Sequence, residues 1–127
     1  MTATCSFVLY LGAHLFTTGL NDRHPSVLCY TPKYDIGVAA YQNSFDVNSV
    51  AVYKKISHGP LSLKYGVTTG YSPTLFYKGR YYNTGGFFFS DNVMFMLVPE
   101  VTIYKDRWQY SISLVGDSLN LGIGISL

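Results

Sequence analysis

Strict alternation of apolar and polar residues along several long segments is the feature that most limits how this chain folds. The C-terminal segment shows it best, with apolar residues at every odd position from 119 to 127 and Ser, Asn or Gly at every even position from 118 to 126. Successive side chains of a β-strand point to opposite faces of a sheet, whereas a helix would spread these apolar positions over all its sides. The pattern therefore predicts β-strands, each with one apolar face.

Turn-forming residues divide the chain into about eight such segments. The strands expected between the turns are 5–16, 26–31, 35–44, 48–57, 61–71, 93–103, 107–114 and 118–127. Residues 72–92 are less regular, and we expect a long connection there with one strand at 85–89. Eight antiparallel strands in a chain of 127 residues predict an all-β protein with one domain over residues 1–127. The expected architecture is a single up-and-down antiparallel β-barrel, with a two-layer sandwich as the alternative.

The weakly polar face of the strands decides which side of the barrel points inward. In a soluble barrel this face would meet water and carry many charges, but here it carries mainly Gly, Ser, Thr, Asn and Gln. Charged residues make up 13% of the chain, against roughly 25% in typical soluble domains. We therefore expect the apolar face to point outward, to lipid or to another protein. The alternatives are a soluble sandwich with a neutral polar surface and a lipocalin-like barrel around an apolar ligand cavity.

Charge and composition also exclude several classes of function. Nucleic acid is not an expected partner, because the net charge of +2 is small and Lys and Arg form no patch. No apolar run approaches the roughly 20 residues of a membrane helix, and residues 1–11 lack the basic start and the cleavage site of a signal peptide. Nucleophile-elbow motifs, paired carboxylates and phosphate-binding loops are absent as well. The residues alone therefore predict neither an enzyme class nor a cofactor.

Two cysteines, Cys5 and Cys29, bear on metal binding and on covalent cross-links. Neither has the spacing to another Cys or His that a zinc site requires, so we expect no metal site. We expect two buried thiols, and a disulfide is the alternative if strand pairing brings the two residues together.

Three histidines are candidates for chemistry. His24 lies before Pro25 in a polar segment and His58 lies in a His-Gly-Pro turn, so we expect loop or solvated roles for both. His14 differs, because it lies on the weakly polar face of an otherwise apolar strand. Such a histidine is more often a hydrogen-bonded structural residue than a catalyst, but it is the candidate with the more suggestive position.

Five short motifs follow one another in order along the chain. They are GAHLF at 12–16, GLNDRHP at 19–25, GVAAYQNSF at 37–45, YGVTTGY at 65–71 and MLVPEV at 96–101. Together they resemble the outer-membrane lipid A palmitoyltransferase family and its short, partly phage-encoded relatives. The resemblance implies an eight-stranded barrel that moves a palmitoyl chain from a phospholipid to lipid A. It extends over residues 10–127, and each motif is short.

The resemblance also implies which residues would carry the reaction. The family's His falls on His14 and its Ser on Ser44, while its Asp falls on Asn43. The last position is a departure, because Asn cannot hold a negative charge beside an imidazole. Neighbouring residues such as Asn43 and Ser44 also point to opposite faces unless the strand ends or bulges there. The family's N-terminal amphipathic helix has no counterpart in the pattern of this chain.

Two functions are compatible with these observations. The first is an outer-membrane barrel that transfers an acyl group from phospholipid, with His14, Ser44 and Asn43 at the reaction centre and phospholipid or lipid A as its partner. The alternative is a non-enzymatic structural barrel, such as a component of a phage virion, whose apolar face packs on neighbouring protein subunits. The sequence leaves open whether the chain is an enzyme.

Overall fold

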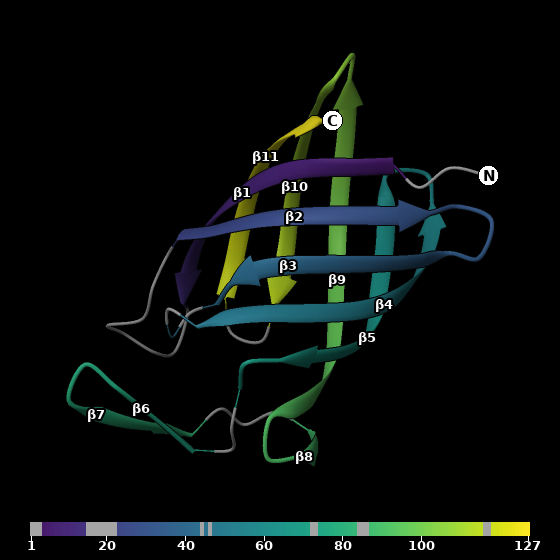
Figure 1. Cartoon of the computed structure of the whole chain (residues 1–127). Helices are drawn as coiled ribbons and strands as arrows, with labels where there is room; N and C mark the ends of the chain where they lie inside the picture. The colour runs from purple at the N-terminus through teal and green to yellow at the C-terminus, as the bar shows by residue number, and fades with distance from the viewer. Residues whose placement is uncertain are drawn as a thin grey trace.

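A computed structural model of the chain contains β-strands and connecting turns, without a helix in the part that it describes (Figure 1). The structure describes residues 4–14, 23–43, 45, 47–71, 74–83, 87–115 and 118–127, and of residues 14, 74–76 and 80–83 it describes the backbone but not the side chains. The strands are β1 (Thr4–His14), β2 (Arg23–Thr31), β3 (Ile36–Gln42), β4 (Asn48–His58), β5 (Leu61–Thr69), β6 (Thr74–Tyr77), β7 (Arg80–Asn83), β8 (Phe88–Ser90), β9 (Val93–Lys105), β10 (Trp108–Val115) and β11 (Ser118–Ser126).

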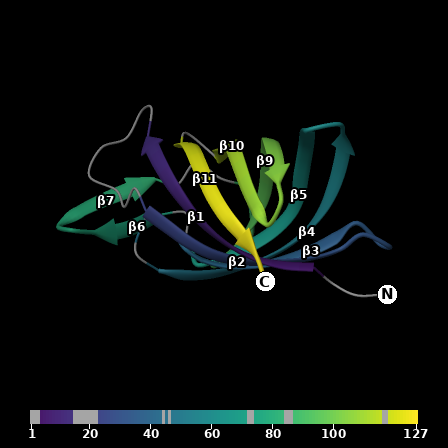
Figure 2. The same cartoon turned by 90° about the horizontal axis from the view of Figure 1, so that it is seen from above.

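Eight of these strands close into an antiparallel barrel. They are hydrogen-bonded in the order β10-β11-β1-β2-β3-β4-β5-β9, and β9 pairs with β10 to complete the ring. Figure 2, which shows the barrel from above, shows the curvature of its wall. The extra strand β8 pairs with the start of β9, and β6 and β7 form a separate hairpin. The predicted up-and-down barrel is confirmed, and the sandwich alternative is wrong.

The two ends of the barrel differ in their connections. One end, here called the termini end, holds the start of β1, the end of β11 and the short turns 32–35, 59–60 and 106–107. The other end, here called the loop end, holds connections 15–22, 43–47, 70–92 and 116–117. The longer connections therefore gather at the loop end.

The region 72–92 holds more structure than the sequence indicated. Of the strand expected at 85–89, residues 88 and 89 belong to β8, and residue 87 is not in a strand. The hairpin of β6 and β7 is not among the predicted elements. Its turn consists of Lys78 and Gly79, both with positive φ (49° and 79°), as a two-residue type I′ turn requires. A Lys-Gly pair is a weaker turn signal than Asn-Gly, which explains the omission. Residues 15–16, 44, 72–73, 84–86 and 116–117 lie outside the described residues.

The apolar side chains point outward, as the sequence predicted. In β11, the outward-facing Leu121 and Ile123 are 55% and 51% exposed. Asn120, which precedes Leu121 and points inward, is 4% exposed. The same alternation holds along β1, where Leu9 is exposed and Val8 is fully buried. The lipocalin-like alternative requires the apolar face to point inward, so this orientation contradicts it.

Glycines make room for tyrosine rings inside the narrow barrel. Tyr53 is 4% exposed, and its neighbours in register are Gly37 on β3 and Gly66 on β5. A Cβ on Gly37 would overlap the Tyr53 ring, and a Cβ on Gly66 would overlap the carbonyl group of Val52. These positions therefore require glycine for close packing rather than for a turn.

Cys5 and Cys29 form a disulfide, so the expectation of two free thiols is wrong. The two residues lie directly opposite each other in the β1–β2 ladder, with Cα atoms 4.0 Å apart. Both occupy outward-facing positions of their strands. The register of β1 against β2 produces this contact, and the spacing of the cysteines in the sequence does not reveal it.

We expect peptide mapping without reductant to recover a cross-linked peptide that contains Cys5 and Cys29. Replacing both cysteines with Ala should lower the free energy of unfolding by about 2–4 kcal/mol, because the cross-link restricts the unfolded chain. Urea titration followed by Trp108 fluorescence measures this change. Rapid alkylation of two thiols in the native, unreduced protein would contradict the disulfide.

Candidate functional site

A buried ion pair organises the barrel interior. Lys64 Nζ on β5 lies 3.1 Å from Glu100 Oε1 on β9, and the two side chains are 9% and 6% exposed. Thr102 donates a hydrogen bond to Oε1 (3.0 Å), and the Tyr10 hydroxyl donates one to Oε2 (3.5 Å). Buried charges are tolerated when they are paired and hydrogen-bonded in this way. The sequence shows both charges on the weakly polar faces of their strands, but only the β5–β9 register brings them together.

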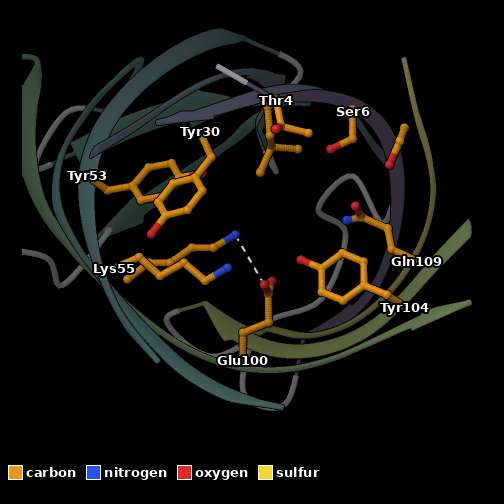
Figure 3. A pocket seen from close by; sticks show the side chains of 11 residues that line it. Thr4, Ser6, Tyr30, Tyr53, Lys55, Glu100, Tyr104 and Gln109 are labelled. Atoms are coloured by element: carbon orange, nitrogen blue, oxygen red, sulfur yellow. Dashed lines mark ion pairs between the residues drawn. The ribbon is translucent and has the colours of Figure 1, made fainter. Parts of the chain in front are cut away.

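A cavity of about 100 Å³ lies beside this ion pair, toward the termini end. Seven of the eight barrel strands contribute to its lining, which we call the vestibule (Figure 3). Tyr104 stands at its mouth, with 62% of its surface exposed. The vestibule is thus enclosed by the barrel wall and reached from the termini end.

Two lysines and three tyrosines give the vestibule its chemical character. Lys64 Nζ lies 5.2 Å from the centre of the Tyr53 ring, and Lys55 Nζ lies 5.0 Å from the centre of the Tyr30 ring. Both distances are within the range of cation–π attraction. Tyr53, Tyr30 and Tyr104 also bring hydroxyl groups to the lining. Sequence analysis did not single out any of these residues.

A second polar cluster lies inside the barrel nearer the loop end. His24 is 9% exposed and belongs to β2, so the loop role expected for it is wrong. Its Nδ1 lies 3.0 Å from the carbonyl oxygen of Gln42, and because a carbonyl only accepts, Nδ1 carries the proton in this contact. A Cβ on Gly12 would lie 3.2 Å from His24 Nε2 and 2.8 Å from Ser118 Oγ. The imidazole is therefore oriented toward Gly12 and β11.

Two of the three residues to which the resemblance assigns chemistry have side chains outside the described residues. His14 is the last residue of β1, and its backbone is paired with Ser118 of β11. Ser44 follows Asn43 in the connection between β3 and β4, and it lies outside the described residues altogether. The end of β1, the end of β3 and the start of β4 all lie at the loop end of the barrel.

Asn43 braces the β3–β4 connection. Its Nδ2 donates to Ser49 Oγ (3.0 Å) and to the carbonyl oxygen of Gly70 (2.8 Å). Its Oδ1 accepts from the backbone N–H groups of Phe45 (2.8 Å) and Val47 (3.2 Å). An Asp carboxylate cannot donate to a carbonyl, so this geometry uses the amide specifically. The strand ends at Gln42, so Asn43 and Ser44 are not bound by strict strand alternation.

The hydrogen-bond ladder between β9 and β10 covers only part of the two strands. It runs from Lys105 paired with Trp108 to Glu100 paired with Ser113 and stops there. The next residue of β9 is Pro99, which has no N–H to donate. β8 covers the start of β9, so within the described residues positions 96–99 have no strand partner on the β10 side. The wall therefore lacks ladder hydrogen bonds in this stretch, between the ion pair and the loop end.

Neither metal-binding clusters nor membrane helices are found in the described part of the chain. No three or more His, Cys, Asp or Glu side chains there are grouped to hold a metal ion. No helix there is long and apolar enough to cross a membrane. No family model, curated protein or solved structure matches the chain.

We expect Lys64→Met to destabilise the protein by about 3–5 kcal/mol, because it leaves the Glu100 carboxylate buried without its partner. Adding Glu100→Gln should recover most of this loss, since the unpaired charge is then gone. Lys54→Met is the matched control, because Lys54 is exposed on the outer face of the same barrel. Urea titration followed by Trp108 fluorescence measures all three. A loss from Lys64→Met no larger than that of the control would contradict the role of the pair.

Proposed function

We propose that this protein is an integral outer-membrane-type β-barrel that acts on lipid, with phospholipid or lipid A as its partner. The observation that carries this proposal is the continuous apolar outer face, formed by exposed side chains such as Phe7, Val52, Leu97, Ile112 and Leu121. A barrel with an apolar outside and a polar inside is the pattern that lipid selects. Strands of about 9–11 residues span a bilayer when tilted, and β1, β2, β4, β5 and β11 have 9–11 residues.

Two further observations support an outer-membrane location. Outer-membrane barrels have short turns on the periplasmic side and longer loops on the outer side, and this barrel has the same asymmetry between its termini end and its loop end. The Cys5–Cys29 disulfide suits an oxidising compartment such as the periplasm. On this proposal the termini end faces the periplasm.

We expect Leu121→Arg to lower the stability of the barrel in lipid vesicles by about 2–4 kcal/mol, because it places a charge in the middle of the apolar face. Tyr34→Arg is the control. Tyr34 is exposed in the turn at the termini end, where a charge near the interface costs roughly 0–1 kcal/mol. Folding into vesicles at increasing urea measures both. A wild-type protein that stays monomeric and folded in buffer without lipid or detergent argues against the membrane proposal.

For the reaction we propose acyl transfer from a phospholipid at the loop end. An acceptor hydroxyl attacks the ester carbonyl, the acyl bond to the donor breaks, and the acyl bond to the acceptor forms. The His14 imidazole would take the proton of the attacking hydroxyl and return it to the departing donor oxygen, and Ser44 would hydrogen-bond at the same centre. The interrupted β9–β10 ladder supports this proposal, because lipid that entered the wall there would break fewer backbone hydrogen bonds.

A non-enzymatic barrel is the second candidate, and Asn43 is the observation that favours it. The amide holds the β3–β4 connection through bonds that a carboxylate cannot all make. Asn43 therefore has a structural role, and it lacks the negative charge of an Asp that would assist an imidazole. On this proposal the apolar outer face packs on neighbouring protein subunits, for example in a virion.

Purified protein in vesicles that contain a labelled phospholipid and lipid A separates the two candidates. Acyl transfer predicts labelled lipid A with the wild type and a loss of at least about 100-fold in rate for His14→Ala and for Ser44→Ala. His58→Ala should leave the rate unchanged, because His58 is exposed at the termini end. The same amount of product from wild type and both alanine variants, including none, would favour the non-enzymatic barrel.

A further inference from the structure

The vestibule carries more positive charge than its own carboxylate balances. Lys64 is paired with Glu100 at 3.1 Å. Lys55 is a second ammonium group on the lining, and it forms no ion pair among the described residues. Asp35, near the rim, accepts a hydrogen bond from the Tyr30 hydroxyl. We propose that the vestibule binds a small soluble oxyanion of the size of inorganic phosphate, with Lys55 as its principal ligand.

Lys55 is positioned for this role by its strand and by Tyr30. It lies at an inward-facing position of β4, two residues after Tyr53, and it points into the cavity (Figure 3). The Tyr30 ring lies 5.0 Å from its Nζ and limits where the ammonium group can go. The Lys64–Glu100 pair closes the inner side of the space. The other nearby carboxylate, Asp35 at the rim, accepts a hydrogen bond from the Tyr30 hydroxyl.

Neutral hydrogen-bond donors complete the site. The hydroxyls of Ser6 and Tyr104 and the amide of Gln109 belong to the same lining and come from three different strands. An oxyanion accepts hydrogen bonds from several directions, and charge-assisted bonds are the stronger ones. A single buried water needs only about 10–15 Å³, so a cavity of about 100 Å³ has room for an ion of a few heavy atoms.

The position of the vestibule favours a free anion over a lipid headgroup. Strands surround it, and the β9–β10 ladder is intact at this level, from Lys105 and Trp108 to Glu100 and Ser113. A lipid phosphate whose chains stay in the bilayer would have to cross this hydrogen-bonded wall. A soluble ion needs only the opening at the termini end, which lies away from the positions of His14 and Ser44.

Titration of isotope-labelled full-length protein with inorganic phosphate tests the proposal. The protein is held in neutral detergent micelles at constant ionic strength, and the backbone amide signals of Tyr30 and Gln109 are followed. We expect saturable shifts with the wild type and at least tenfold weaker binding with Lys55→Gln. Lys54→Gln removes the same charge from the neighbouring residue, which lies on the outer face of the barrel. This variant should bind phosphate like the wild type. Lys55→Arg should retain binding, which separates loss of the ligand from loss of the fold.

Three results would overturn the proposal. The first is the absence of saturable shifts with the wild type, and the second is equal affinity of Lys55→Gln and Lys54→Gln. The third is a shift of the same amide signals in bicelles that contain phosphatidylglycerol, without added phosphate. This result would identify a lipid headgroup as the ligand. None of these results depends on acyl transfer, because the assay measures no reaction.

Discussion

The closed ring of antiparallel hydrogen bonds is the constraint on which the other features of this protein depend. Once β9 pairs with β10, each of the eight barrel strands has two neighbours, and alternate side chains must point into a narrow interior or out of the wall. The narrow interior then holds few bulky side chains. Inside, each large side chain needs a small neighbour, as Tyr53 does between Gly37 and Gly66. Closure therefore sets the alternation of the two faces, and the size and polarity of the residues on each face decide which one points inward.

The polar interior follows the same constraint. Lys64, Glu100, Thr102 and Tyr10 satisfy one another in a space that the wall shields from solvent. Such a network adds little to the stability of the fold, because removing the two charges from water costs free energy. It does disfavour any strand register in which one of the charges loses its partner. It also divides the interior. The vestibule lies on the side of the termini, and the cluster around His24 lies nearer the loop end, where acyl transfer is proposed.

Prediction from sequence succeeded where a signal was local and failed where register decided. Period-two alternation located all eight barrel strands and the outward face, because that period belongs to each strand by itself. The pairing of Cys5 with Cys29 and of Lys64 with Glu100 joins residues on different strands, and no local pattern encodes which positions oppose each other. Pro25 indicates a break in the chain beside His24 and so a loop, yet Pro25 lies on an outward position within β2.

The candidate site shows the same division. The resemblance placed His14, Asn43 and Ser44 in order along the chain, but it could not show that the amide of Asn43 would be engaged by Ser49 and Gly70. By itself the sequence determined that the chain forms strands, that about eight of them form a barrel and that their apolar sides face outward. Only the tertiary structure decided the disulfide, the buried ion pair and the vestibule, because each depends on the relative register of neighbouring strands.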